Sequence, residues 1–468
     1  MKTLIKNGLV LLLNEEGWRA EKKDLLIEGN RIAKIADAIP SKTEKKAMDA
    51  SPANGGEKDQ RAAVAEKASE VIDAAGKLVM PGLINAHTHA YMTIHRNFAD
   101  DLAFFDWLDH VDRVEQGMTE EDVYWTTMLA IIEMIRSGTT CFVDMSIKSA
   151  KAKSGPLAAA AGAVLDAGFR AVICRGLAGV ADSEESLRKY GEAVHEMDLL
   201  QDESRLQFVH GPHAPYSCMA DYLQKLTQSC RDRGIGQHIH LSESQAEMEG
   251  IAKDHGGMTP IQYADSLGVF DVPCIVAHAV YATEEDIRIM AEKGVSVAAC
   301  PKSNMKLGNG FAPVEKMLAA GVNVCLGTDG CGSNNSLNMF QEMNAAALVY
   351  KGANRKAQCV GAGEVLRMAT VGGAKAIGRE GELGVIREGA LADLILIDLH
   401  RPQFMPANNI LSGLVYSATG NEVDTVMVDG RILMKDGKLT TIDEEKVFEA
   451  CRVITARLKM EEKMELTI

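Results

Sequence analysis

Histidines gather in a few short apolar segments of this chain. His87 and His89 stand two positions apart in "PGLINAHTHA", and the same spacing recurs at His238 and His240 in "GQHIHLSES". Residues two apart in a strand point to the same face. Imidazole nitrogens together with a carboxylate are the donors that a catalytic zinc-type metal prefers, and an open position then holds a water. Metal-assisted hydrolysis is therefore the chemistry that these residues suggest.

Further polar residues follow other apolar segments. His210 and His213 end "LQFVHGPH", His278 lies in "CIVAHAV", and Asp329 lies in "GTDG". Together with the two pairs above, seven of the twelve histidines stand at such segment ends. A single buried histidine is as often structural as functional. Their joint placement predicts one shared site.

The position of each residue in its segment predicts which residues bind the metal. We predict that His87, His89, His240 and Asp329 bind the metal, because each ends its segment. His238 is expected to pack one layer deeper than His240. The segment "LQFVHGPHAPYS" lacks the lysine that would bridge two metal ions. One divalent ion is therefore expected, zinc in the first place and iron as the alternative.

Eight short apolar runs must position these side chains, and all of them lie between residues 80 and 380. Segments with helical periodicity separate most of them. Residues 119–138 and 283–294 are examples, each opened by Thr with acidic residues in the first turn and closed by Gly. This alternation predicts an α/β fold of the (β/α)8 TIM-barrel type, whose sites form at the C-terminal strand ends. A doubly wound sheet is the alternative, but its glycine-rich phosphate loop is missing.

Both ends of the chain have strand character instead. The expected elements are strands over 2–13, 24–36 and 71–82, hairpins over 384–399 and 423–439, and a helix over 443–464.

These elements predict a small β-sandwich domain built from both termini. Residues 1–80 supply its N-terminal part, 81–380 form the metal-dependent barrel, and 381–468 supply the C-terminal part with a terminal helix. Residues 41–70, rich in Lys, Glu, Ala and Ser, are expected to form a surface insertion.

The composition and charge of the chain indicate which classes of protein it can belong to. The 468 residues are 46% hydrophobic and 25% charged, which is typical of a globular enzyme. A net charge of −15 argues against nucleic acid or an anionic membrane as partner. The sequence shows no apolar stretch of ~18 residues that would span a membrane. Ten cysteines without a Cys-x-x-Cys pair, and an N-terminus that does not read as a signal peptide, lead us to expect a cytoplasmic protein with reduced thiols.

Taken together, these segments resemble the amidohydrolase superfamily, and within it the branch of S-adenosylhomocysteine/5′-methylthioadenosine deaminases. The matching segments include "PGLINAHTHAYMTIHRNFADDLAFFDWL", "HIHLSES", "CPKSNMKLGNGFAPV" and "LGTDGCGSNNSLNMFQEM". The resemblance implies a homo-oligomeric, mononuclear metal enzyme. Its expected reaction is hydrolytic deamination of a 5′-modified adenosine, namely 5′-methylthioadenosine, S-adenosylhomocysteine, 5′-deoxyadenosine or adenosine, which yields the inosine analogue and ammonia.

The resemblance also implies catalytic roles. His87, His89, His240 and Asp329 match the metal ligands of the family. Glu243, three residues after His240, matches the residue that protonates the purine ring nitrogen. His278 matches the histidine that orients the attacking hydroxide, and Asp329 is expected to take the proton of the water.

Three further residues match substrate contacts, in addition to Glu243 and Asp329. Glu115 matches the carboxylate that holds the ribose hydroxyls, and His213 matches a histidine that contacts the nucleoside. Arg175, in "CRGL", matches an arginine that reaches the 5′ substituent.

One departure bears on the substrate. Relatives that bind an amino-acid carboxylate carry a second arginine about a dozen residues after "RGL", but here that stretch reads "AGVADSEESL" and the nearest arginine, Arg188, is expected in a helix. The identity of the 5′ group therefore stays open. Other amidohydrolase reactions, such as triazine hydrolysis or guanine deamination, are the alternatives. A non-catalytic assembly protein is disfavoured because every expected ligand is present.

Overall fold

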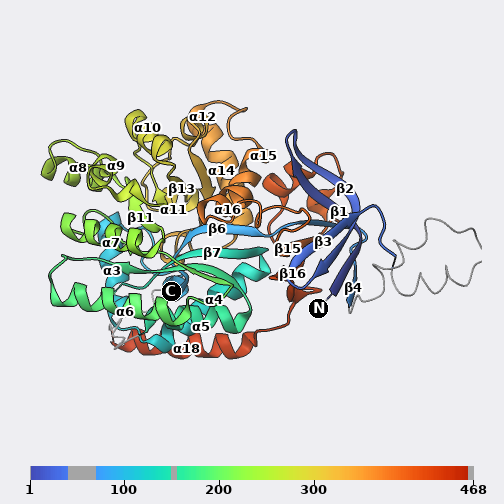
Figure 1. Ribbon diagram of the computed structural model, residues 1–468, viewed down its shortest axis with the longest axis horizontal. Coiled ribbons are helices and arrows are strands. Elements are labelled where there is room, and N and C mark those ends of the chain that lie inside the picture. Colours follow the sequence, from blue (N-terminus) through green and yellow to red (C-terminus); the bar gives the residue numbers. More distant parts are fainter. Residues whose placement is uncertain (1, 41–69, 149–154, 462–468) are drawn as a thin grey trace, which may run out of the picture.

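A computed structural model describes residues 2–40, 70–148 and 155–461 of the chain. Figure 1 shows a barrel of strands and helices beside a sheet to which both ends of the chain contribute. The insertion predicted over residues 41–70 lies outside the described residues, except for its last residue, which begins a strand. Among the described helices, none combines the length and the apolar character that crossing a membrane requires.

Eight parallel strands form the barrel, and each coincides with one of the eight predicted runs. They lie in two sheets, one running from β6 to β10 and one from β11 to β14. A parallel bridge between His210 and Gln237 joins the sheets on one side. On the other side the backbone N–H of Asp329 donates to the carbonyl of His87. The strands are β6 (Leu83–Thr88), β7 (Thr139–Ser146), β8 (Arg170–Leu177), the split strand β9 (Leu206–Phe208) and β10 (Gly211–Pro212), β11 (Gln237–Leu241), β12 (Cys274–His278), β13 (Ser296–Ala299) and β14 (Asn323–Leu326).

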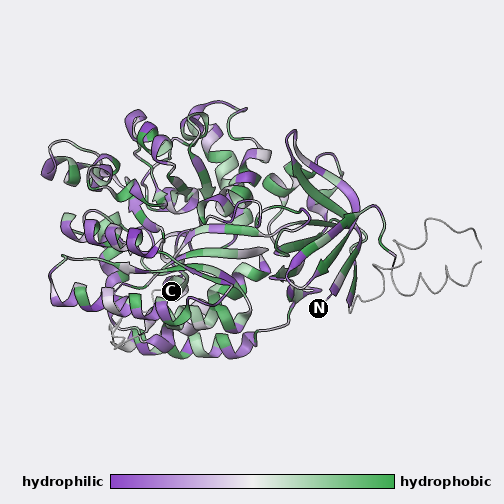
Figure 2. Cartoon of the chain, in the orientation of Figure 1, coloured by the Kyte–Doolittle hydropathy of each residue, from purple (hydrophilic) through white to green (hydrophobic). Residues whose placement is uncertain are grey.

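Helices surround these strands and turn their polar faces outward, while the strands are apolar (Figure 2). The two helices predicted from their caps are confirmed. Thr119 and Thr283 each form a capping box with an aspartate three residues later. The helices of this part are α3 (Phe104–Gln116), α4 (Glu120–Arg136), α5 (Pro156–Ala167), α6 (Glu184–Leu200), α7 (Ala220–Arg233), α8 (Gln245–Asp254), α9 (Pro260–Ser266), α10 (Glu284–Lys293), α11 (Pro301–Lys306), α12 (Val314–Ala319), α13 (Cys331–Asn334), α14 (Met339–Asn354), α15 (Ala362–Arg367) and α16 (Gly373–Ala376).

A nine-stranded sheet combines strands from the two ends of the chain. Its order is β18-β17-β16-β15-β5-β1-β2-β3, with β4 paired to β1. The final helix α18 (Glu444–Glu461) leaves this sheet and packs against α4 (Figure 1). The strands are β1 (Lys2–Asn14), β2 (Gly17–Glu28), β3 (Arg31–Ala36), β4 (Glu70–Asp73), β5 (Lys77–Pro81), β15 (Leu394–Asp398), β16 (Val423–Val428), β17 (Arg431–Lys435) and β18 (Lys438–Leu439).

The predicted hairpin over 423–439 is confirmed, but the hairpin over 384–399 is wrong. Only Leu394–Asp398 forms a strand there. Upstream, Gly384 and Gly389 adopt positive φ angles, which turn the chain away from an extended course. The backbone N–H groups of Gly389 and Ala392 instead donate to carbonyls in and just before β3.

A buried ion-pair cluster fixes the barrel to the terminal sheet. Arg170, the first residue of β8, donates through Nε to Oδ2 of Asp393 at 2.7 Å and through Nη2 to Oδ1 of Asp429 at 2.9 Å. The backbone carbonyl of Asp393 also accepts from the N–H of Gly82, where the chain enters the barrel. The start of β6, the strand that contains His87 and leads into His89, is therefore held in place.

Candidate active site

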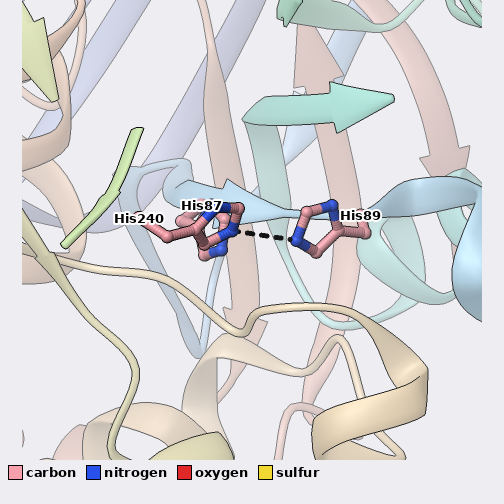
Figure 3. Close-up of side chains that lie close together, drawn as sticks. All are labelled: His87, His89 and His240. Carbon is pink, nitrogen blue, oxygen red and sulfur yellow. Dashed lines mark hydrogen bonds between the residues drawn. The ribbon is translucent and has the colours of Figure 1, made fainter. Parts of the chain in front are cut away.

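The predicted histidines meet at one end of the barrel. His87 lies in β6 and His89 directly follows it, while His240 lies in β11, and one nitrogen of each lies within 4.8 Å of the others. Figure 3 shows the three rings turned toward one another. His278, at the end of β12, and Asp329, just after β14, form a second such group with His87. All five side chains are buried.

The tautomers of two rings follow from their partners. Nδ1 of His89 lies 2.7 Å from the carbonyl oxygen of Met145, and Nδ1 of His240 lies 2.7 Å from that of His213. A carbonyl oxygen only accepts, so both Nδ1 atoms carry a hydrogen, and each neutral ring keeps its lone pair on Nε2. The two Nε2 atoms lie 3.2 Å apart (Figure 3), with lone pairs that face each other. A cation bound by both nitrogens removes this repulsion.

His87 has the same arrangement with a different partner. Its Nδ1 lies 3.0 Å from Nε2 of His238. Its own Nε2 is buried, has no hydrogen-bond partner among the described residues, and lies 3.2 Å from Oδ1 of Asp329. His238 belongs to neither group of close donor atoms and supports the ring of His87 from behind. Such outer contacts orient a metal ligand and raise its basicity.

Asp329 completes the donor set. Its Oδ2 accepts hydrogen bonds from the hydroxyls of Ser303 and Ser333, both at 2.7 Å, which leaves Oδ1 beside the imidazoles. Burial opposes its ionisation, yet the nearby imidazoles of His87, His278 and His89 hold the pKa of Asp329 well below its usual range. Three imidazole nitrogens and one carboxylate oxygen are a donor set for a divalent metal.

The site bends the backbone sharply. His278 and Asp329 adopt φ angles of 74° and 60°, in the left-handed region that non-glycine residues seldom occupy. Such strain gathers at functional sites. Here it falls at the end of β12 and in the loop that follows β14.

Glu243 lies beside this cluster of histidines and Asp329. Its Oε2 is 3.6 Å from Nε2 of His278, and its Oε1 accepts from the amide of Asn309 at 3.3 Å. Burial, and then the negative charges of Asp329 and Glu247, raise the pKa of Glu243 well above its ordinary value. A carboxyl group in this environment keeps its proton to higher pH than an exposed glutamate does, which suits a general acid.

A cavity opens above this cluster. Its empty space is about 490 Å³ with the open mouth included. Glu115, on α3, lines the wall and accepts a hydrogen bond from the hydroxyl of Tyr91 through Oε1. Its Oε2 is buried without a hydrogen-bond partner among the described residues. Burial raises the pKa of Glu115 to about 7.

His213 lines the same cavity, with Nδ1 2.9 Å from the hydroxyl of Ser217.

The side chain of Arg175, a predicted site residue, points away from the cavity. Its neighbour Gly176 lines the wall, but the arginine side chain is 2% exposed and turned toward α6. There it donates to Glu192 at 2.8 Å, and Glu192 also accepts from Arg188. Arg188 lies in α6, as expected from its sequence.

Several residues of the site were missed from sequence. Lys148 and Asp112 line the cavity and form an ion pair. Glu247 accepts from the backbone N–H of Glu243 at 2.7 Å and so fixes the turn that presents it. Asn304 faces Nδ1 of His278 at 3.0 Å through its carbonyl oxygen. The available signals were weak: Asp112 stands one helical turn before Glu115, and Lys148 follows the second barrel strand.

Similarity to known proteins agrees with this architecture. The chain is 44% identical over 383 residues to the 5-methylthioadenosine/S-adenosylhomocysteine deaminase of Moorella thermoacetica, covering 82% of this chain and 87% of that protein. It is 41% identical to the 5'-deoxyadenosine deaminase of Methanocaldococcus jannaschii, over 95% and 97% of the two chains. The crystal structure of a zinc-bound adenosine deaminase from Xanthomonas campestris matches with a TM-score of 0.86 and 29% identity, over 98% of each chain.

The family itself is shown by a match over most of the chain. The sequence profile of the amidohydrolase family matches residues 78–433, which include every barrel strand and all the residues that gather around the cavity. The crystal structure of a zinc-bound atrazine chlorohydrolase from Arthrobacter aurescens shares the fold, with a TM-score of 0.83 and 22% identity over 97% of this chain and 100% of that chain. This chain is a member of the amidohydrolase family.

Proposed function

We propose that the protein hydrolyses the exocyclic C–N bond of the adenine ring in a 5′-modified adenosine, releasing ammonia and the inosine analogue. The observation that carries this proposal is a metal-type donor set and a buried acid, Glu243, in one cavity with an unpartnered carboxylate oxygen of Glu115. A carboxylate of this kind suits the hydroxyls of a ribose and so favours a nucleoside over a bare ring. The deaminase names of the similar proteins support the same reaction.

One zinc ion is the proposed metal. Nε2 of His87, His89 and His240, together with Oδ1 of Asp329, would hold it. When bound, the ion lowers the pKa of a water toward ~7 and so supplies hydroxide at neutral pH.

The chain's own groups then move the protons. Asp329 accepts the proton of the attacking water, and Glu243 donates its proton to N1 of the ring as C6 is attacked. Asp329 then passes its proton to the amino group, the C6–N bond breaks and ammonia leaves, while the new C6 hydroxyl returns its proton to Glu243. Because Nδ1 of His278 faces the carbonyl oxygen of Asn304, Nε2 of His278 keeps a lone pair and orients the attacking oxygen by accepting its hydrogen. General acid–base catalysis of this kind contributes about 10²–10⁴-fold.

Substrate binding is assigned to the wall of the cavity. Oε2 of Glu115 would accept from a ribose hydroxyl, and His213 would contact the nucleoside. The contact predicted between Arg175 and the 5′ substituent requires the ion pair with Glu192 to open, because this pair turns the guanidinium away from the cavity.

A substrate panel tests the reaction. Purified protein should release ammonia and consume the adenine chromophore of at least one among 5′-methylthioadenosine, S-adenosylhomocysteine, 5′-deoxyadenosine and adenosine. Guanine and a triazine serve as controls and should be poor substrates, because neither carries a ribose for Glu115. A zinc-loaded protein inert toward all four nucleosides would refute the proposal.

Replacement of His238 by Phe should weaken zinc binding about 10–100-fold, the usual cost of removing a group that supports a metal ligand. The variant removes the nitrogen 3.0 Å from Nδ1 of His87 and leaves that ring without its support. Zinc affinity is measured by competition with a chelating dye. His210→Phe is the matched control, since His210 is also buried but contacts Ser229 instead. Equal zinc affinity in wild type and His238→Phe would contradict this role.

The remaining assignments concern the whole chain. We propose the domain division at residues 80 and 380, with the terminal strands as a composite β-sandwich, because strands from both ends share one sheet. A cytoplasmic location is supported by the ten cysteines, all of them buried and unpaired. A homo-oligomer is proposed by family resemblance.

A further inference from the structure

We propose that Tyr91 is a positioning residue for the sugar of the substrate. Its hydroxyl holds the carboxylate of Glu115 in the orientation that receives the ribose hydroxyls, and it thereby makes the cavity selective for ribonucleosides over nucleosides that lack these hydroxyls. This inference rests on the proposed deaminase function of the same cavity. It concerns a residue with no part in the proton transfers described above.

Tyr91 and Glu115 come from different elements and meet at the cavity wall. Tyr91 lies in the short helix η2 (Ala90–His95), and Glu115 lies in the last turn of α3. The Tyr91 hydroxyl donates to Oε1 of Glu115. Both residues line the cavity, and they are 3% and 2% exposed. Water therefore competes little for this hydrogen bond.

The hydrogen bond gives the two oxygens of Glu115 different roles. Oε1 is occupied by Tyr91, whereas Oε2 is buried without a hydrogen-bond partner among the described residues. The terminal torsion of a glutamate side chain is broad, so a carboxylate without a fixed partner can turn. A fixed Oε1 also fixes the direction of Oε2. A buried acceptor without a donor is costly, and a ribose hydroxyl would supply that donor.

Tyr91 can hold this carboxylate because its own segment is anchored on both sides. Before it, the backbone N–H of Ala90 donates to Oδ1 of Asp144 at 2.7 Å. After it, the hydroxyl of Thr93 donates to the carbonyl of Thr126 at 2.7 Å. These contacts tie η2 to β7 on one side and to α4 on the other. The tyrosine hydroxyl is therefore presented from a fixed backbone.

The same segment joins the sugar site to the metal-type donors. Tyr91 follows His89 by two residues, and its ring belongs to one apolar cluster with Trp107 and Val111 of α3. The tyrosine thus connects the strand end that presents the imidazoles to the helix that carries Glu115. A ribose bound by Glu115 is therefore held at a set position relative to the imidazoles.

The test compares a ribonucleoside with the same nucleoside without its sugar hydroxyls. The pair is the fastest substrate of the panel above and its 2′,3′-dideoxy counterpart, such as adenosine and 2′,3′-dideoxyadenosine. In wild type, loss of the hydroxyls should lower kcat/KM by roughly 10–100-fold, the effect of losing hydrogen bonds to a charged group. Tyr91→Phe should lower kcat/KM for the ribonucleoside by roughly tenfold, mainly through KM, and leave kcat/KM for the dideoxy nucleoside unchanged.

Tyr124→Phe is the matched control. The Tyr124 hydroxyl also donates to a carboxylate, Oδ2 of Asp166 at 2.8 Å, but this pair lies at the surface and does not line the cavity. Its loss should leave both kcat/KM values at the wild-type level. Turnover of the dideoxy nucleoside by Tyr91→Phe at the wild-type rate shows, in the same preparation, that the fold and the metal site are intact.

The outcomes separate this inference from the proposed function. If wild type deaminates the dideoxy nucleoside as efficiently as the ribonucleoside, the sugar hydroxyls are not read and the inference is overturned, while the deaminase stands. If Tyr91→Phe loses the same factor with both nucleosides, or keeps wild-type kinetics with both, Tyr91 does not position Glu115 and the inference is again overturned. If no nucleoside of the panel reacts, the proposed function fails and this inference falls with it.

Discussion

Glu243→Gln is expected to lower kcat by about 10²–10⁴-fold while the protein keeps its metal. Glutamine has nearly the same shape and can still accept from Asn309, but it has no acidic proton to give to the purine ring. Burial and nearby negative charges raise the pKa of Glu243 well above its ordinary value, so the wild-type carboxyl keeps that proton to higher pH than an exposed glutamate does. The loss should therefore fall on kcat, with little change in KM.

Steady-state kinetics and metal analysis on the same preparation check this result. Glu249→Gln is the control, because Glu249 is an exposed residue of the neighbouring helix α8 and contacts Gln245. It should retain wild-type kcat and metal content. A Glu243→Gln variant with wild-type turnover would remove Glu243 from the mechanism. A variant that lost its metal would show that Glu243 supports the metal site.

The barrel and the close approach of its histidines and Asp329 could be predicted from sequence because both depend on local patterns. Each barrel strand is a short run of apolar residues bounded by turn signals, and parallel strands of a barrel deliver their C-terminal ends to one site. His87, His89, His240 and Asp329 stand at those ends, so their approach follows from topology alone. The order of apolar runs and turns in the sequence thus determines which residues lie close together in the fold.

The same patterns do not predict which way a side chain points when its partner is far away in the sequence. Arg175 ends a barrel strand, yet an ion pair with Glu192 turns it away from the cavity, and a strand position does not predict that partner. Lys148 and Asp112 meet across 36 positions of sequence with no motif to link them. The false hairpin at 384–399 has the same cause, since donors of that segment pair with carbonyls near β3, more than 300 residues away.

Removal of the metal by a chelator should abolish turnover, and added zinc should restore it. The reason lies in the cluster itself: Nε2 of His89 and Nε2 of His240 lie 3.2 Å apart, and both carry lone pairs. Nε2 of His87 is buried without a hydrogen-bond partner among the described residues. These nitrogens are costly to bury unless a cation binds them.

The same argument predicts a stability effect that does not depend on turnover. A metal that binds only the folded state stabilises it by about 2.7 kcal/mol when its free concentration is 100 times Kd. Thermal unfolding should therefore shift to higher temperature as zinc is added, and His240→Asn should lose both the shift and the activity. His400→Asn, at an exposed histidine far from the cavity in sequence, should keep both. If zinc leaves the unfolding temperature of wild type unchanged while activity survives exhaustive chelation, the cluster is a buried polar network and the hydrolytic mechanism cannot stand.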